Sequence, residues 1–172
     1  MIEAVVVVGI IAAIVLLMLL STYNGLMQQR QEVRSAWAQI DEQLKRRYDL
    51  VPVLISTVQS QGGTAAAKLP AVSAAKNQAA VAFNPTQLAQ AEAALSVAIH
   101  DVLATIANDP ALSGNSSLIE IRQQLLASEK QIDQARQRYN ERVDALNATL
   151  ASFPQVVTAK VIGLHEQPGF ES

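Results

Sequence analysis

An uncharged, apolar N-terminal stretch limits how this chain can fold more than any other feature of its sequence. Residues 4–20 read AVVVVGIIAAIVLLMLL, and no charged residue follows until Arg30. A bilayer core of about 30 Å is crossed by about 20 apolar residues in a helix. Residues 1–22 are therefore predicted to form a transmembrane anchor, with Tyr23 at the headgroup boundary, where amphipathic rings are favoured.

A helix of a soluble protein and a cleaved signal peptide both fit this stretch less well than a membrane anchor does. A helix on the surface of a soluble core would keep a polar face, whereas here apolar side chains surround the whole helix. A cleaved signal peptide would begin with basic residues and end at a small-residue cleavage site, but Glu3 stands at the start and no such site follows. Glu3 itself is interpreted either as a solvated carboxylate or as a contact with the N-terminal amine of a neighbouring chain.

The distribution of basic residues predicts the orientation of the anchor. Arg30 and Arg34 lie soon after the apolar stretch, and no lysine or arginine precedes it. Because basic residues near a span stay on the cytoplasmic side, we expect the N-terminus outside and the body of the protein in the cytoplasm.

The chain after the anchor begins with a long helical pattern. Apolar side chains between residues 26 and 58 recur at steps of three, four or seven residues, which is typical of a single helical stripe. No strong stop signal separates this stripe from the apolar stretch, so the sequence predicts one long rod. Pro52 lies inside the stripe and is expected to kink the rod, because its ring disrupts the preceding turn.

Three further helices are expected at about residues 64–83, 86–108 and 117–153. Asn84 before Pro85 marks the start of the second, and Ser117 with Glu120 matches a capping box at the start of the third. The third helix also carries side chains spaced seven apart, which predict a seam against another helix. These are Leu118, Leu125, Ile132, Tyr139, Leu146 and Phe153.

These patterns together predict an all-α fold. An N-terminal transmembrane helix continues into the long helix, at about residues 23–60, of an antiparallel cytoplasmic helical bundle. The bundle spans residues 23–155, and residues 156–172 form a short apolar tail that we expect to pack against the bundle rather than on lipid.

Two other segments indicate contacts beyond a single helix. Residues 64–108 are rich in alanine and nearly uncharged, so we expect other helices or other chains to cover them. Lys45, Arg46 and Arg47 form a local basic cluster. They are interpreted as a solvated face paired with neighbouring acids, or as a contact with anionic lipid or another subunit.

The composition leaves little chemistry available. The chain has no cysteine and only two histidines, and neither His100 nor His165 has a companion ligand at metal-binding spacing. It shows no phosphate-binding loop and no serine paired with a base, so we expect no enzymatic activity, no cofactor and no metal. A net charge of −2 disfavours nucleic acid as a partner.

Residues 23–54, which read YNGLMQQRQEVRSAWAQIDEQLKRRYDLVPVL, resemble the LemA family of bacterial membrane proteins. The most specific parts are the YN pair at 23–24, the run AWAQID at 36–41 and the run QLKRRYDLVP at 43–52. The pairs Tyr139-Asn140 and Phe153-Pro154 and the closing PGFE at 168–171 are also similar to the family. The segment SQGGTAAAKLP after Val58 departs from it.

The resemblance implies an antiparallel helical body on a single span, with a very short outer N-terminus and a cytoplasmic remainder. The membrane implied is a bacterial inner (cytoplasmic) membrane or an organelle membrane. The family includes a magnetosome protein, so the resemblance implies membrane-organelle or membrane-shaping work, and it supplies no catalytic residues.

The function expected from the sequence is therefore a non-enzymatic scaffold. It would self-assemble through its bundle into a homo-oligomer and organise or remodel the lipid bilayer. The alternative is a membrane adaptor that docks a signalling or membrane-protein-biogenesis partner. The candidate interaction residues are Glu3, Trp37, Lys45, Arg46, Arg47, Tyr48, Pro52, Tyr139 and Phe153.

Overall fold

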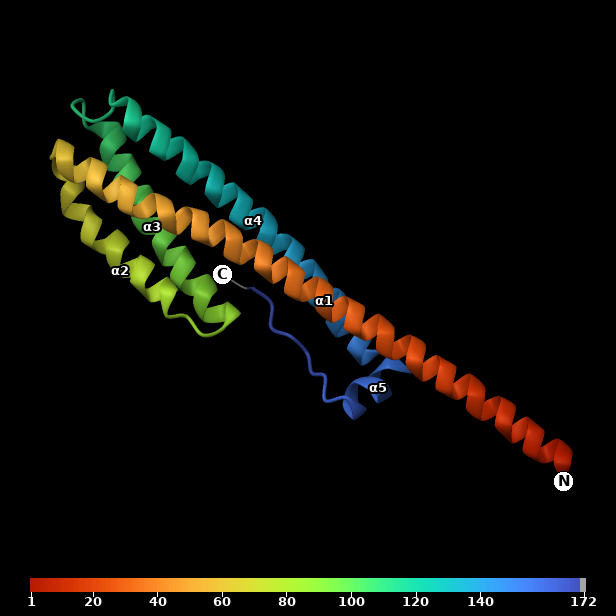
Figure 1. Ribbon diagram of the computed structural model, residues 1–172. Coiled ribbons are helices and arrows are strands. Elements are labelled where there is room, and N and C mark those ends of the chain that lie inside the picture. Colours follow the sequence, from red (N-terminus) through yellow and green to blue (C-terminus); the bar gives the residue numbers. More distant parts are fainter. Residues whose placement is uncertain (171–172) are drawn as a thin grey trace.

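The computed structural model describes residues 1–170, and within them every regular element is a helix (Figure 1). The elements in chain order are α1 (Ile2–Gln61), the 3₁₀-helix η1 (Thr64–Lys68), α2 (Leu69–Ala80), α3 (Pro85–Asn108), α4 (Ser116–Ala151) and α5 (Gln155–Val161). The all-α class with one long apolar N-terminal helix is confirmed. Glu171, the last residue of the PGFE motif, lies outside the described residues.

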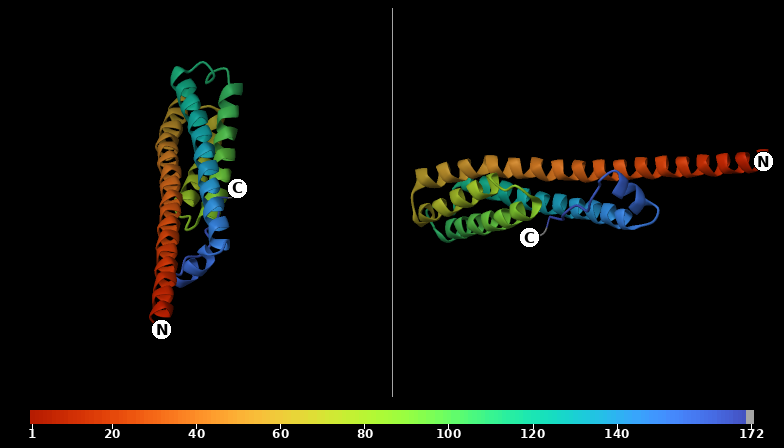
Figure 2. Two further views of the ribbon diagram at one scale, coloured as in Figure 1. Left: turned by 90° about the vertical axis from the view of Figure 1, so that its right-hand side faces the viewer. Right: turned by 90° about the horizontal axis from the view of Figure 1, so that it is seen from below.

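The helix α1 is unbroken over 60 residues, which corresponds to about 90 Å. Its first third extends beyond the rest of the molecule (Figure 2). This part is long and apolar enough to cross a membrane, and none of its most apolar stretch is buried against the rest of the protein. The helix ends where Gly62 and Gly63 adopt φ values of 73° and 90°, which residues with a Cβ rarely adopt.

The predicted kink at Pro52 is wrong. α1 continues through this residue, and its ribbon shows no sharp bend along its length (Figures 1 and 2). Pro52 itself is exposed, whereas Val51 and Leu54 are fully buried. We attribute the straight axis to this packing before and after the ring, which offsets the lost hydrogen bond.

The helix α4 lies along the part of α1 that follows the apolar segment (Figure 1). Arg142 Nη1 lies 3.0 Å from Glu32 Oε2, and Arg138 Nη1 lies 3.4 Å from Gln39 Oε1. Residues later in α1 therefore meet residues earlier in α4. The predicted seam is buried except at its last position, because α4 ends at Ala151 and Phe153 is 80% exposed.

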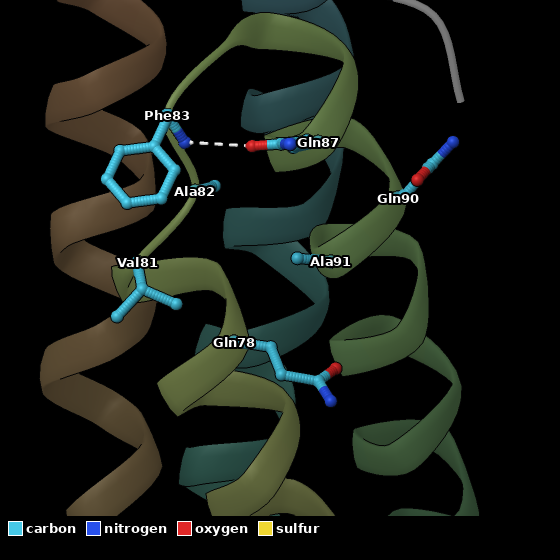
Figure 3. Close-up of a pocket in the computed structure, with 7 residues that line it drawn as sticks. All are labelled: Gln78, Val81, Ala82, Phe83, Gln87, Gln90 and Ala91. Atoms are coloured by element: carbon cyan, nitrogen blue, oxygen red, sulfur yellow. Dashed lines mark hydrogen bonds between the residues drawn. The ribbon is translucent and has the colours of Figure 1, made fainter.

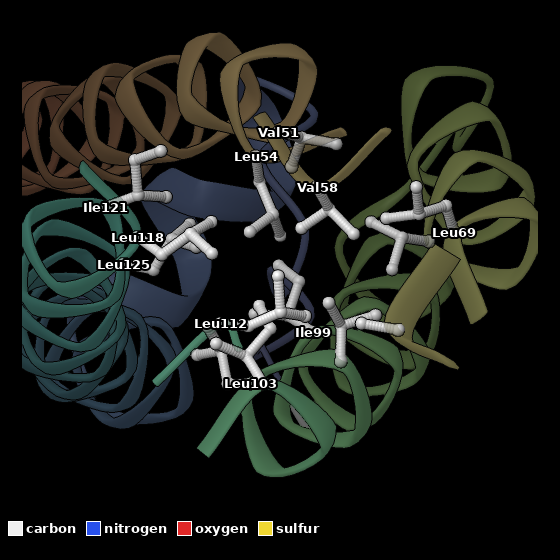
Figure 4. Packing of buried hydrophobic residues seen from close by; sticks show 14 of the residues in the cluster. Val51, Leu54, Val58, Leu69, Ile99, Leu103, Leu112, Leu118, Ile121 and Leu125 are labelled. Atoms are coloured by element: carbon white, nitrogen blue, oxygen red, sulfur yellow. The ribbon is translucent and has the colours of Figure 1, made fainter. Parts of the chain in front are cut away.

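The hairpin of α2 and α3 packs on the half of the α1–α4 pair far from the N-terminus (Figure 2). Figure 4 shows side chains from all four helices meeting around one apolar core, among them Val51, Leu69, Ile99 and Leu118. Much of the apolar surface of the alanine-rich segment is thus buried against other helices of the same chain. This burial stabilises the fold, because it removes apolar area from water.

The other half of the α1–α4 pair is covered by α5 and by the extended residues that follow it. Ala159, Leu164 and Phe170 share a buried cluster with Leu26 of α1 and Leu146 of α4. Two different segments therefore complete the core. The α2–α3 hairpin does so at the far end, and the chain after α4 does so near the apolar segment.

The start of α4 differs from the predicted capping box. Asn115 is the cap, and its Oδ1 accepts a hydrogen bond of 3.2 Å from the Leu118 N–H. Glu120 bonds instead to Gln124 one turn further on. The capping box fails because α4 already begins at Ser116, which places Ser117 inside the first turn, where its side chain cannot act as a cap.

The other predicted boundaries lie closer to the observed ones. Asn84 caps α3, with its Oδ1 accepting from the Gln87 N–H at 2.8 Å. The helix expected at 64–83 is divided into a 3₁₀-helix and α2, which ends at Ala80.

Candidate functional site

Trp37 of α1 lies in an aromatic cluster with α4 and the C-terminal tail. Its ring packs edge-on against Tyr139, with centroids 5.3 Å apart, and lies 6.0 Å from Phe170. The Arg136 guanidinium is 4.8 Å from the centre of the Phe170 ring, a cation–π distance. Burial raises the pKa of Tyr139, and its hydroxyl donates to the Pro168 carbonyl at 2.9 Å. The predicted residues Trp37 and Tyr139 therefore meet, but they bind the chain's own tail.

Two asparagines of α4 bind the tail through its backbone. Asn140 Nδ2 donates to the Phe170 carbonyl at 3.1 Å, and its Oδ1 accepts from the Phe170 N–H at 2.7 Å. Asn147 makes the same pair of bonds with Gln167, each at 2.9 Å. We term Asn140 and Asn147 the tail clamp. Because the clamp contacts backbone atoms, it recognises an extended chain more than particular side chains.

The tail clamp leads to a testable expectation. Asn140→Ala removes two hydrogen bonds, each worth about 1 kcal/mol, so opening of the tail should become roughly 30-fold more frequent. Hydrogen exchange followed by mass spectrometry should show faster exchange confined to residues 164–170. Asn77→Ala, at an exposed position of α2, is the matched control and should leave this segment protected. Unchanged exchange in Asn140→Ala would mean that Asn147 and the aromatic cluster hold the tail without the Asn140 pair.

A second cluster lies buried between α1 and α3. Arg47 and Glu92 are each 3% exposed, and Arg47 Nη1 lies 3.3 Å from Glu92 Oε2. Arg47 Nη2 also donates to Ser96 Oγ at 2.9 Å, and the Tyr48 hydroxyl donates to Glu92 Oε1. The prediction that Arg47 belongs to a solvated basic face is wrong, since its side chain points into the interface and its partner comes from another helix.

Burial controls the electrostatics of this second cluster. Removal from water raises the pKa of Glu92, and the Tyr48 hydroxyl and the Arg47 charge oppose that rise. Burial and the neighbouring carboxylate also raise the pKa of Tyr48, so its phenol stays protonated and keeps its hydrogen bond. Because the carboxylate and guanidinium are closed off from solvent and pair with each other, we interpret the cluster as a polar tie between α1 and α3.

The remaining predicted interaction residues lie apart from both clusters. Arg46 is exposed and pairs with Glu42 one turn earlier in the same helix. Phe153 lies exposed at the turn before α5. Three others are exposed side chains of α1: Glu3, Lys45 and Pro52.

The turn between α2 and α3 carries an uncharged depression (Figure 3). Phe83 is 91% exposed and Val81 is 64% exposed, although the Phe83 N–H is fixed by a 3.2 Å bond to Gln87 Oε1. The depression is lined by Gln78, Val81, Ala82, Phe83, Gln87, Gln90 and Ala91. Since none of these seven residues is charged, the depression suits an uncharged protein surface better than a charged ligand.

Possible metal ligands are not grouped within residues 1–170. In that range no three His, Cys, Asp or Glu side chains gather closely enough to hold a metal ion. His100 Nε2 lies 3.0 Å from Glu129 Oε2, in a partly exposed contact between α3 and α4.

Sequence reasoning missed Glu92 and the tail clamp as site residues. Glu92 had a visible signal, because it occupies a position of the apolar stripe of α3 between Leu88 and Leu95. Asn140 and Asn147 are seven residues apart, which puts both amides on one face of α4. The sequence of α4 does not indicate what these two asparagines bind, because their partners are backbone atoms of the C-terminal tail.

The family match lies in the part of the chain that follows the apolar segment. A family model described as the LemA family matches residues 36–172. None of the curated proteins compared with the chain matches it. The matched range contains the later part of α1, every other helix and both clusters described above. This match spans most of the chain, and the chain therefore belongs to the LemA family.

Proposed function

We propose that this protein is a non-enzymatic, membrane-anchored scaffold whose antiparallel helical bundle self-associates and organises or remodels the membrane. The observation that carries the proposal is the exposed apolar turn between α2 and α3. Phe83 and Val81 are 91% and 64% exposed, although side chains of these types are usually buried. The uncharged depression beside them supports contact with a second uncharged surface.

The long helix supports a lateral mode of association. Because α1 is one rigid helix from Ile2 to Gln61, copies anchored in one membrane would hold the α2–α3 turn at the same height. Two identical turns at the same height can meet around a two-fold axis along the membrane normal, as in a self-complementary dimer interface.

The basic residues after the apolar segment support the orientation that we propose. Arg30 and Arg34 are exposed on α1, and arginines this close to a span favour the cytoplasmic side. The N-terminus would then lie outside and the body in the cytoplasm. The membrane would be a bacterial inner (cytoplasmic) membrane or an organelle membrane.

The scaffold proposal predicts oligomers of the full chain in detergent. Light scattering and electron microscopy at micromolar concentration should show assemblies larger than one chain. The double variant Val81→Ser with Phe83→Ser should shift them to monomers, because it removes the apolar side chains from the proposed contact. Leu126→Ser, which changes an exposed apolar residue of α4, is the control and should assemble normally.

The same proteins test the effect on membranes. Reconstituted into liposomes, the unchanged chain should alter vesicle shape in electron micrographs, and the double variant should not. A full chain that is strictly monomeric in detergent and leaves liposomes unchanged would contradict the scaffold proposal.

An adaptor is a second candidate function, and the tail clamp favours it. Paired asparagine amides can hold any extended peptide backbone, so a segment of a signalling or membrane-protein-biogenesis partner could replace residues 167–170 at Asn140 and Asn147. A stoichiometric partner that is lost when Asn140 and Asn147 are changed to alanine would support the adaptor. Recovery of the protein alone would support the scaffold.

A further inference from the structure

The geometry points to a second membrane contact, made by α5. We propose that the side chains of Phe153, Val157 and Val161, which we term the α5 apolar face, lie in the headgroup layer of the same bilayer that α1 enters. The inference rests on the membrane anchoring in the proposed function, and it adds a surface and a partner, the lipid interface, that the anchor alone does not imply.

The exposed side of α5 is the apolar one. Phe153, Val157 and Val161 are 80%, 48% and 81% exposed. The spacing of four residues places Val157 and Val161 on one side of α5, and Phe153 lies in the turn just before the helix. On the other side, Thr158 and Ala159 are buried against the α1–α4 pair. A surface helix in water shows the opposite pattern, with its polar side outward.

The position of α5 identifies the bilayer as the occupant of this face. α5 and the turn before it form the end of the body nearest to the apolar segment of α1 (Figures 1 and 2). Ala159 and Leu164 share a buried cluster with Leu26, which lies six residues, or about 9 Å of helix, beyond Leu20. Helices that rest on membranes lie about 5–10 Å deep at the boundary of headgroups and acyl chains. α5 therefore lies within about 9 Å of helix from the end of the apolar segment, next to the headgroup layer, and a small tilt of α1 brings its exposed side into that layer.

The charge on α5 fits the same occupant. Lys160 is the only charged residue between Ser152 and Leu164, and it is exposed beside the apolar face. A lysine at this place can extend its ammonium group to lipid phosphates while its methylene groups stay near the acyl chains. A helix of seven residues would bind lipid weakly alone, but α1 keeps it at the bilayer, which makes its binding intramolecular.

Two attachments would restrict the protein in a way that one cannot. A single span leaves the body free to rotate about the long axis of α1 and to tilt. Contact by the α5 apolar face sets the tilt of α1 against the bilayer and the side of α1 toward which the body tilts.

The experiment uses the absence of cysteine in the chain. Val161→Cys and, as matched control, Val81→Cys are each labelled with an environment-sensitive fluorophore and reconstituted as the full chain into vesicles of phosphatidylcholine and phosphatidylglycerol. Both residues are exposed valines, at 81% and 64%, but only Val161 belongs to the α5 apolar face. The label at 161 should shift its emission to shorter wavelength and lose intensity when lipids carry spin labels near the headgroup. The label at 81, which lies in the proposed contact between copies, should not be quenched by these lipids.

Each outcome has a distinct meaning. A label at 161 that behaves like the label at 81, in protein that floats with the vesicles, would overturn the α5 contact and leave the anchor intact. A label at 161 that is shielded from water but not quenched by lipid would also overturn it, in favour of a second copy of the chain. Protein that does not float with vesicles would contradict the anchoring on which both proposals depend.

Discussion

Glu92→Leu is expected to lower the free energy of unfolding of the body by about 3–5 kcal/mol, because it leaves Arg47 buried without its counter-charge. Arg47 is 3% exposed, so its guanidinium reaches water only if the α1–α3 interface opens. The effect should appear as a lower midpoint of chemical denaturation of the full chain in detergent, followed by circular dichroism.

Two further variants separate charge from packing in this prediction. Asp101→Leu changes another acid of α3 whose side chain is 67% exposed and 3.5 Å from Lys68, and it should cost less than about 1 kcal/mol. Combining Arg47→Met with Glu92→Leu removes both charges and should restore most of the lost stability. A double variant as unstable as Glu92→Leu alone would show that the loss comes from packing and not from the unpaired guanidinium.

Placing two arginines in the apolar segment is expected to release the protein from membranes. Ile11→Arg with Ile14→Arg puts both charges on one side of α1, near the middle of its apolar segment, each at a cost of about 2.5–3.5 kcal/mol. The sum of about 5–7 kcal/mol corresponds to a loss of partitioning of roughly a thousandfold or more. Flotation of the full chain with vesicles measures this directly.

The control for this prediction keeps the segment apolar. Ile11→Leu with Ile14→Leu changes the same two exposed positions and should float as the unchanged chain does. If the double-arginine variant also floated, the apolar segment of α1 would not be the anchor. Another part of the chain would then have to attach the protein to the membrane.

The helices could be predicted because their signals are local and repeated. The stripes of α1 and α4 recur every three, four or seven residues, and Asn84 before Pro85 marks the start of α3 in the sequence itself. Such patterns depend on a few neighbouring residues and on the period of the helix. The ends are harder to predict, because nearby polar residues can each be a candidate for the cap, as Asn115 and Ser117 are at the start of α4.

The clusters could be predicted only in part, because they join distant segments. In the sequence, Arg47 is one of three consecutive basic residues. Its partner Glu92 lies 45 residues away on α3, so the local pattern does not indicate the pair. Trp37 and Tyr139 were identified as interaction residues, but their partner Phe170 comes from a tail that has no helical period to indicate where it binds. The expected bend at Pro52 failed for a similar reason, since burial of Val51 and Leu54 depends on helices that come later in the chain.

The division of the core between two covering segments has a consequence for biosynthesis. The α2–α3 hairpin follows α1 directly, whereas residues 155–170 follow every other helix and leave the ribosome after them. While α4 is still being translated, the apolar strip of α1 around Leu26 and Ile40 has no cover from the tail. The half of the molecule beside the apolar segment can therefore complete its folding only after α4 has been translated.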